Sequence, residues 1–119
     1  MKYMLLICRD EEAWEKFPPA QRQRIYAETL ALAEELTAEG RYLGGFPLHP
    51  SSAATSVRVR NGKRLVTDGP FAETREQIGG YMLIDVENLD DAVAIAARIP
   101  LAHTSTVEIR PVREGPPTS

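Results

Sequence analysis

Two stretches of the chain, residues 3–8 and 81–86, are apolar at nearly every position, so both faces of an extended backbone would be hydrophobic there. Strands that are covered on both faces show this pattern. Residues 41–48 and 106–112 are further strand candidates. Pro111 places the last of these at a sheet edge, because proline cannot donate a backbone hydrogen bond to a second neighbour. The pattern therefore predicts a sheet whose centre is formed by the two most apolar strands.

Two helices are predicted between these strands. The first covers residues 20–39, where apolar residues recur with the period of one helix face and Gly40 suits the C-terminal end. The second begins at Asn88, an N-cap with Asp91 three residues on, and must stop before Pro100. The stripe of the first helix consists of Ile25, Thr29, Leu32, Ala33 and Leu36. We expect both helices to be scaffold.

A β-hairpin is predicted in the middle of the chain. Residues 57–60 and 63–67 are its strands, and Asn61-Gly62 between them is the strongest short hairpin signal. The hairpin carries four basic residues, Arg58, Arg60, Lys63 and Arg64. Basic residues in such a place usually form a solvated edge that discourages pairing with other molecules. A binding site for an anion is the alternative.

The predicted order of elements is β-α-β-(hairpin)-β-α-β, an α+β fold of the ferredoxin-like βαββαβ type with an inserted β-hairpin. Both helices should pack on one face of the sheet, so the apolar centre of the other face needs a cover. A second copy of the same sheet would supply it, and we therefore expect a homodimer. Residues 1–113 are expected to form one domain, and residues 114–119 a disordered tail rich in Pro, Gly, Ser and Thr.

Length and composition are those of one soluble globular domain, with 119 residues, 43% hydrophobic and 26% charged. The net charge of −3 argues against a nucleic-acid partner, which needs a concentrated basic surface. No apolar run reaches the ~20 residues that span a bilayer, so no membrane partner is expected. We interpret the apolar N-terminal run as a strand and not as a signal peptide. Cys8 is the single cysteine, which excludes an internal disulfide and predicts a reducing, cytoplasmic location.

The corner at Asp68-Gly69-Pro70-Phe71 is the first candidate for a site wall. Gly69 permits backbone angles that are closed to other residues, and Pro70 fixes its own φ. A carboxylate and an aromatic ring are thereby displayed from a stiff bend. An ordinary turn, in which the Asp side chain caps its own backbone, is the alternative. Tyr81 begins a central strand and either points its hydroxyl into a cleft or packs in the core.

These residues belong to the run Val66-Thr-Asp-Gly-Pro-Phe-Ala-Glu-Thr-Arg-Glu-Gln-Ile-Gly-Gly-Tyr, which resembles the DGPF-type branch of the YCII-related proteins. The resemblance extends to Ala54-Thr-Ser-Val-Arg-Val-Arg-Asn-Gly-Lys before the run and to Val107-Glu-Ile-Arg-Pro-Val after it, and so covers nearly the whole chain. It implies a dimeric α+β barrel, in which two ferredoxin-like protomers place their sheets face to face. It also implies a cleft between the sheet and the loops.

The resemblance further implies acid–base chemistry by a His–Asp pair, and one relative looks like a dehydrochlorinase that acts on a chlorinated hydroxyquinone. The aspartate of the pair maps onto Asp68. In the YCII branch the histidine lies on the first helix, and residues 20–39 contain none, so His49 and His103 are the two alternatives. DGPF-type proteins often accompany extracytoplasmic-function sigma factors, which implies a regulatory accessory role as another possibility.

His49 precedes the hairpin and Asp68 follows it, so a hairpin that folds back on itself brings the two ends of the segment together. An unperturbed histidine both takes and gives a proton near neutral pH, and a carboxylate beside it fixes its tautomer. We therefore predict His49 and Asp68 as the catalytic pair. The alternative is a solvent-exposed loop histidine.

Phe71, Tyr81 and Arg110 are the predicted substrate-binding residues. Arg110 shares one face of its strand with Glu108, which allows either an ion pair or an anion site. No metal or cofactor is predicted, since metal-ligand spacing and the Walker, dinucleotide and nucleophile-elbow patterns are missing from the sequence.

Two hypotheses of function remain open. The first is an enzyme-like protein that uses acid–base chemistry of a lyase or dehydrochlorinase type in a cleft at the interface of the two sheets. The second is a non-catalytic ligand-binding or regulatory module. The sequence leaves the question of catalysis itself undecided.

Overall fold

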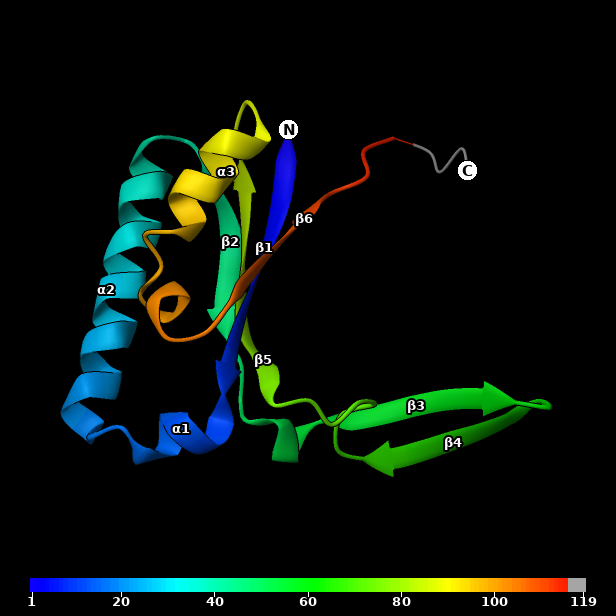
Figure 1. Cartoon of the computed structure of the whole chain (residues 1–119). Helices are drawn as coiled ribbons and strands as arrows, with labels where there is room; N and C mark the ends of the chain where they lie inside the picture. The colour runs from blue at the N-terminus through cyan, green and yellow to red at the C-terminus, as the bar shows by residue number, and fades with distance from the viewer. Residues whose placement is uncertain (116–119) are drawn as a thin grey trace.

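One antiparallel sheet forms the body of the protein (Figure 1). The structure is a computed structural model and describes residues 1–115. The sheet consists of β1 (Lys2–Asp10), β2 (Tyr42–Pro47), β5 (Glu76–Asp85) and β6 (Val107–Pro111), in the order β2-β5-β1-β6. The two strands predicted to be central, β1 and β5, are central, and the strand with Pro111 is an edge. This order is that of the ferredoxin-like fold.

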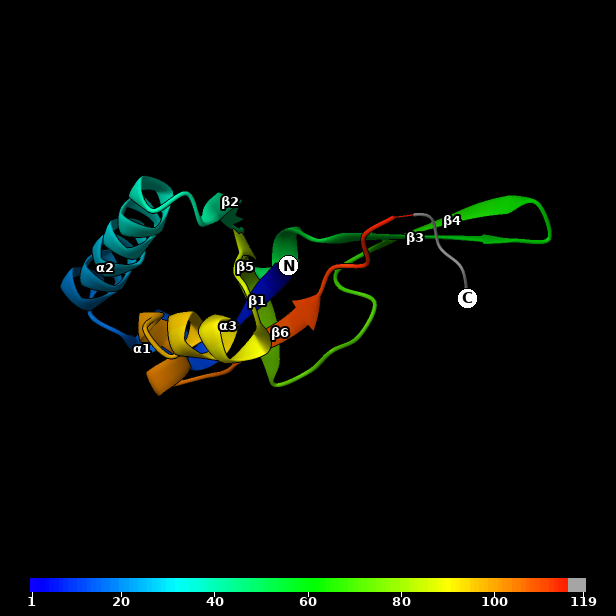
Figure 2. The same ribbon diagram turned by 90° about the horizontal axis from the view of Figure 1, so that it is seen from above.

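Helices cover only one face of the sheet, as Figures 1 and 2 show. They are α1 (Glu11–Lys16), α2 (Pro19–Ala38) and α3 (Leu89–Ala96), and a short helical turn, η2 (Pro100–His103), follows α3. The predicted N-cap of α3 is confirmed, because Asn88 Oδ1 accepts a hydrogen bond of 2.9 Å from the Asp91 N–H. The helix ends three residues before Ile99, which is nevertheless buried. We call the covered side of the sheet the helix face and the other side the open face.

The hydrophobic core lies between the helices and the helix face. Alternate residues of β1 point into it, and α2 contributes three residues of its predicted stripe, Leu32, Ala33 and Leu36. The largest fully buried side chains are Leu5, Leu36, Ile84, Ile95 and Ile99. Each contributes about 1.5–3 kcal/mol by burial before conformational entropy is subtracted. Within residues 1–115, no helix covers the open face (Figure 2). It carries Phe46 from β2, Met4, Leu6 and Cys8 from β1, and Tyr81 and Leu83 from β5, all of them half-buried or exposed.

The hairpin forms a separate two-stranded sheet, with β3 (Thr55–Arg60) paired to β4 (Lys63–Asp68). It projects from the body on the side away from the helices, as Figures 1 and 2 both show. Asn61 and Gly62 have φ of 52° and 73°, so both central residues of its turn are left-handed, as the Asn-Gly pair predicted. A short 3₁₀ turn, η1 (Ser51–Ala53), precedes the first strand of the hairpin.

β5 begins at Glu76, five residues earlier than predicted. The polar residues before Tyr81 pair with the polar end of β1, where Gln77 lies opposite Arg9 and Glu76 opposite Asp10. The register shifts between Ile7 and Cys8. An extended strand therefore runs through a segment whose composition resembles that of a loop, because its partner strand is polar at the same level.

The C-terminal tail predicted over residues 114–119 falls mostly outside the described part of the chain, which ends at residue 115. Glu114 forms an ion pair of 3.5 Å with Lys2. Within residues 1–115, every helix is too short or too polar to cross a bilayer.

Candidate functional site

A cavity of about 390 Å³ lies between α2 and the sheet, and its lining extends past edge strand β2 to Phe46 and Tyr81 of the open face. We call it the α2 cavity. Its buried wall is formed by apolar side chains of the sheet, of α2 and of η2: Ile7, Met82, Ala33 and Leu101. Its rim is exposed, with Leu30 of α2 at 61% and Phe46 of β2 at 67% of full exposure. The cavity thus runs from an exposed apolar rim to a buried apolar wall.

Glycines line the cavity where β2 and β5 pass beneath it. Gly45, Gly79 and Gly80 all belong to the lining, and Gly45 and Gly80 lie close to neighbouring backbone. A Cβ at Gly45 would come within 2.2 Å of the Tyr81 carbonyl oxygen. The Gly44-Gly45 and Gly79-Gly80 pairs in the sequence therefore mark strands whose surface is bare at the cavity.

Arg9 is the only charged residue among the described residues that line the α2 cavity. It follows Tyr3, Leu5 and Ile7 in the alternation of β1 and is 4% exposed, so its guanidinium occupies a position of the core. Nη1 donates to the Tyr26 hydroxyl at 3.3 Å and Nη2 to the Leu48 carbonyl oxygen at 3.5 Å. Nε is buried without a hydrogen-bond partner. A fixed positive charge therefore lies at an otherwise apolar cavity.

Aromatic rings surround this guanidinium. Its central carbon lies 4.8 Å from the centre of the Trp14 ring, within the range of a cation–π contact. Trp14 in turn meets Tyr26 edge to face, with ring centroids 5.5 Å apart. Trp14 is buried and belongs to the core. Short helix α1, which begins at the N-cap Asp10, places this ring directly after the strand that carries Arg9.

The other polar side chains of the cavity are largely occupied with their own backbone. The Thr29 hydroxyl donates to the Ile25 carbonyl oxygen at 2.7 Å, and the Tyr42 hydroxyl donates to the Gly45 carbonyl oxygen at 3.3 Å. Burial, with a smaller contribution from Tyr81, raises the pKa of Tyr42 above its ordinary value, so it stays neutral. These hydroxyls add no charge to the site.

His49 and Phe71, two of the predicted site residues, line one and the same depression of about 540 Å³ beside η1 and the start of β5. The depression is separate in its lining residues from the α2 cavity. Phe71 is 81% exposed. The loop that follows His49 is tied to α1, because Ser51 donates from its backbone N–H and its hydroxyl to the Glu11 carboxylate. The chain around His49 is therefore anchored.

Asp68 lies at the end of β4 and lines neither of these cavities. The hairpin does close on itself as predicted, since the Gly69 N–H donates to the Ala54 carbonyl oxygen at 2.7 Å. Gly69 has a φ of 97°, which explains the glycine at this corner. Within residues 1–115, however, His49 and Asp68 share neither a hydrogen bond nor an ion pair. His103, the alternative partner, lies on η2 and contacts the Ala97 carbonyl oxygen at 3.0 Å.

Tyr81 and Arg110 lie on different parts of the sheet. Tyr81 lines the α2 cavity and meets Phe46 edge to face, with centroids 6.5 Å apart. Arg110 is exposed on edge strand β6, where its Nε lies 3.5 Å from a carboxylate oxygen of Glu108. The predicted substrate-binding residues are thus spread over three places: the depression, the α2 cavity and the sheet edge.

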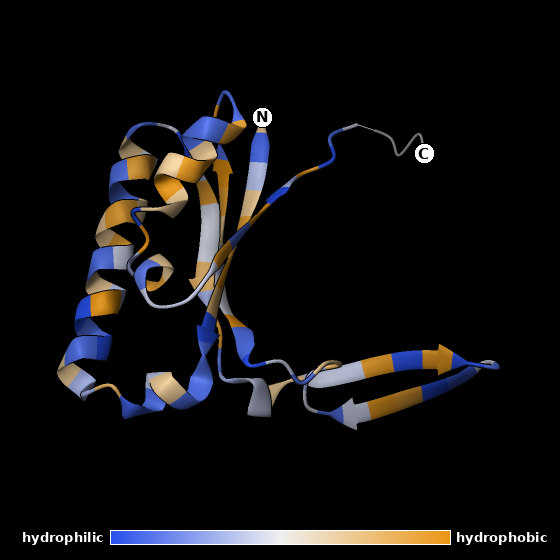
Figure 3. Ribbon diagram, in the orientation of Figure 1, coloured by the Kyte–Doolittle hydropathy of each residue, from blue (hydrophilic) through white to orange (hydrophobic). Residues whose placement is uncertain are grey.

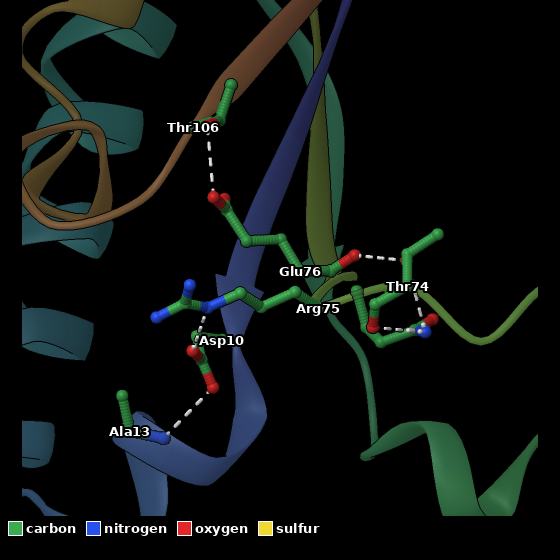
Figure 4. A network of polar contacts seen from close by, with 7 residues as sticks. Asp10, Ala13, Thr74, Arg75, Glu76 and Thr106 are labelled. Carbon is green, nitrogen blue, oxygen red and sulfur yellow. Dashed lines mark hydrogen bonds and ion pairs between the residues drawn. The ribbon is translucent and has the colours of Figure 1, made fainter.

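A polar cluster joins the ends of β1 and β5 beside these cavities (Figure 4). Asp10 accepts hydrogen bonds from the Ala13 N–H at 3.1 Å and from Arg75 Nε at 3.3 Å. The first of these bonds and then the second lower the pKa of Asp10. Thr106 donates to Glu76 at 3.4 Å, and the other carboxylate oxygen of Glu76 is buried without a partner. Within residues 1–115, no group of three or more His, Cys, Asp and Glu side chains is placed to hold a metal ion.

Arg9 and the α2 cavity were missed by the sequence analysis, although the sequence contains a signal for both. Position 9 continues the alternation of Tyr3, Leu5 and Ile7, so a charged residue there falls on the core side of a central strand. Charged residues are rarely buried unless they are paired or functional. A strand prediction extended by one residue beyond Cys8 would have singled out Arg9.

Comparison with known proteins gives two matches. A family model described as the YCII-related domain matches residues 1–115. An uncharacterised protein of Rhizobium meliloti (strain 1021) is 33% identical over 114 residues, which cover 94% of this chain and 92% of that protein. The family match covers all four strands of the ferredoxin-like sheet and the helices on it. The chain is therefore a member of the YCII-related family.

Proposed function

We propose that this protein binds a small, mainly apolar molecule in the α2 cavity. The observation that supports this is the cavity itself: about 390 Å³, apolar walls, an exposed rim and strands kept bare by glycines. Ligand sites in proteins commonly enclose 300–1,000 Å³ and combine apolar walls with few polar groups. The cavity fits this description closely.

Binding without catalysis is the version of this function that the geometry supports best. The residues that line the α2 cavity include no Asp, Glu, His, Cys, Ser or Lys. A general acid or base must come within hydrogen-bond reach of the proton that it transfers. Tyrosine hydroxyls and Thr29 are the only neutral groups there that carry a proton on oxygen, and Thr29 donates to its own helix. We therefore propose that the protein is a non-catalytic ligand-binding module.

Acid–base chemistry of a lyase or dehydrochlorinase type is the second candidate, and its place would be the depression that His49 and Phe71 share. Asp68 would need to approach His49 for the predicted pair to operate. Replacing His49 by Ala and Asp68 by Asn tests this proposal. Turnover of a chlorinated hydroxyquinone that depends on both residues would establish it, and turnover that survives both changes would exclude the pair.

We propose further that the protein acts as a homodimer, a dimeric α+β barrel in which the open faces of two sheets meet. The open face presents a continuous apolar row, because Leu6 lies opposite Tyr81 in the register and Tyr81 lies opposite Phe46. Exposed apolar patches of this kind usually mark an interface. Figure 3 shows apolar segments along the strands of the sheet. A cytoplasmic location and the DGPF-type branch, which rest on Cys8 and on the Asp68–Phe71 corner, belong to the same proposal.

The projecting hairpin supports this dimer. Its cross-strand pairs place Val57, Val59 and Val66 on one side, where all three are about 60% exposed. A two-stranded hairpin alone is marginally stable in water, so this apolar side needs a surface to pack on. The hairpin extends on the side of the open face, where the second copy would lie (Figure 2). Its four basic residues belong to a chain whose net charge is −3, so the remainder of a partner copy is acidic overall.

A cavity-filling substitution with a matched control tests the proposed binding. Thr29 and Thr37 both lie on α2, and each hydroxyl donates to the carbonyl oxygen four residues earlier at 2.7 Å. Only Thr29 of the two lines the cavity. We expect the neutral dye N-phenyl-1-naphthylamine to bind saturably, as followed by its fluorescence. Thr29→Phe should weaken this binding at least tenfold, and Thr37→Phe should leave it unchanged.

Two results would contradict the proposal. In the first, the dye shows no saturable binding to the unmodified protein. In the second, Thr29→Phe and Thr37→Phe have the same affinity for the dye as the unmodified protein, so that any bound dye lies elsewhere. Circular dichroism of both variants confirms that the fold is retained.

A further inference from the structure

The positive charge of Arg9 indicates which class of ligand the α2 cavity binds. This inference rests on the proposed binding function. A guanidinium carries five N–H donors and no acceptor. Of the Arg9 nitrogens, Nη1 and Nη2 each make one bond to a neutral oxygen, at 3.3 and 3.5 Å, and Nε makes none. The bonding capacity of this buried group is therefore largely unused.

The positive charge of Arg9 is also uncompensated. In residues 1–115, all the carboxylates that form ion pairs do so with other cations, and none lies within 4.0 Å of Arg9. Taking a charge out of water is costly unless an opposite charge and further hydrogen bonds replace its hydration. A buried arginine without an acidic partner can therefore form an ion pair with an anionic ligand.

The Trp14 ring does not remove this imbalance. A cation–π contact such as that at 4.8 Å attracts the guanidinium but leaves its net charge and its N–H donors as they are. The Tyr26 hydroxyl and the Leu48 carbonyl oxygen orient the group in the same way, as neutral partners. These contacts fix the position of Arg9 without neutralising its charge.

Gly79 lets the Arg9 side chain pack directly against the backbone of β5. A Cβ on this residue would come within 2.9 Å of Arg9 Nε and within 3.0 Å of its Cδ. Both residues line the α2 cavity. The absence of a side chain at Gly79 therefore makes room for Arg9 itself and sets the position of its guanidinium at the cavity.

We propose that the ligand of the α2 cavity is an apolar monocarboxylic acid, whose carboxylate pairs with Arg9 and whose aromatic or aliphatic body fills the apolar remainder. A planar guanidinium matches a carboxylate with two parallel hydrogen bonds. The lining provides one cation and no lysine, which suits a single negative charge and not a phosphate dianion. The volume of the cavity limits the apolar part of the ligand to one or two fused rings or to an aliphatic chain of medium length.

Paired ligands that differ only in the head group test this assignment. The ligands are 2-naphthoate with 2-naphthamide, and decanoate with decanamide, measured by calorimetry at pH 7 and by displacement of the neutral dye. We expect each acid to bind at least tenfold more tightly than its amide. Arg9→Met should abolish this preference while the neutral dye still binds, and Arg9→Lys should retain part of it. Gly79→Ala, which keeps the charge but crowds Nε, should reduce the preference as well.

The outcomes separate this inference from the binding function on which it rests. If acid and amide bind equally to the unmodified protein, or if Arg9→Met keeps the preference for the acid, the assignment of Arg9 is wrong and the cavity remains a ligand site. If neither acids, amides nor the dye bind, the proposed function fails together with the inference. Retained dye binding by Arg9→Met and Gly79→Ala shows that each variant is folded.

Discussion

Nη1 of Arg9 lies 3.3 Å from the hydroxyl oxygen of Tyr26, and this contact joins β1 to α2 at the cavity that the two elements help to line. Both groups come from elements that the sequence predicts well, a central strand and the first long helix. Neither group is a partner that neutralises the other, since a phenol hydroxyl is uncharged. The contact positions a buried cation without satisfying it, which distinguishes a binding residue from a structural ion pair.

Replacing Arg9 by Met should therefore stabilise the ligand-free protein by about 1 kcal/mol. Removing an uncompensated buried charge regains a desolvation cost of up to several kcal/mol, against the loss of two long hydrogen bonds and a cation–π contact of about 0.5–2 kcal/mol. Methionine fills irregular space with little strain. Urea unfolding followed by circular dichroism measures the change.

Arg110→Met is the control for this experiment. Arg110 is exposed and its ion pair with Glu108 is a surface pair, so the free energy of unfolding should change by less than about 0.5 kcal/mol. A loss of more than about 2 kcal/mol in Arg9→Met would show that Arg9 is structural, contrary to our assignment.

Much of the fold could be predicted from the sequence because its signals are local. The continuous apolar runs identify the central strands, Asn88 identifies the start of α3, and Asn61-Gly62 identifies the hairpin turn. The start of β5 was missed because four of the residues 76–80 are polar or glycine, and their strand conformation depends on pairing with the end of β1. Pairing between distant segments has no local signal.

The site was harder to predict because proximity in space depends on where the cavities form. The closure of the hairpin brings Ala54 and Gly69 together, as expected, yet Asp68 remains outside the depression that contains His49. The α2 cavity brings together two residues of β1, one face of α2 and three glycines of β2 and β5. The clearest signal of the cavity in the sequence is Arg9, a charged residue at a position that the alternation of β1 assigns to the core.

A charge on the open face should convert the proposed dimer into a monomer. Leu6 lies at the centre of this face on strand β1, and its side chain is outside the core. Leu6→Lys should raise the dissociation constant at least a hundredfold, because an interface of apolar side chains would bury an unpaired ammonium. Ala31→Glu, on the exposed side of α2, is the control. Sedimentation velocity at micromolar concentrations distinguishes the two states, and a monomeric unmodified protein would contradict the proposal.

The hairpin amides should be protected from hydrogen exchange only when the protein is dimeric. A lone two-stranded sheet opens readily, so dilution or the Leu6→Lys change should speed exchange in residues 55–68 by at least tenfold. Val57→Ser with Val66→Ser should have the same effect, since these two residues are opposite each other on the apolar side. Leu65→Ser, on the other side of the hairpin, should have little effect on the exchange rate. Fast exchange at every concentration would mean that the hairpin packs on no second copy.

The stability of the protein in acid should depend on Asp10. The hydrogen bond from the Ala13 N–H, and after it the bond from Arg75, place the pKa of Asp10 below its ordinary value, so the folded state favours the ionised form. The stabilisation is complete above the pKa of an unfolded Asp, about 3.9, and is lost as the pH falls through the lower pKa of the folded state.

The substitution Asp10→Asn tests this dependence, because asparagine keeps an N-cap but cannot ionise. The stability of Asp10→Asn should therefore be lower than that of the unmodified protein at pH 7, and the two curves should converge below about pH 4. Asp90→Asn changes an acid in the first turn of α3 that is not its N-cap, and it should leave the shape of the curve nearly unchanged. Urea unfolding between pH 2.5 and 7 measures all three, and a parallel offset of the Asp10→Asn curve across the whole range would show that its charge has no part in folding.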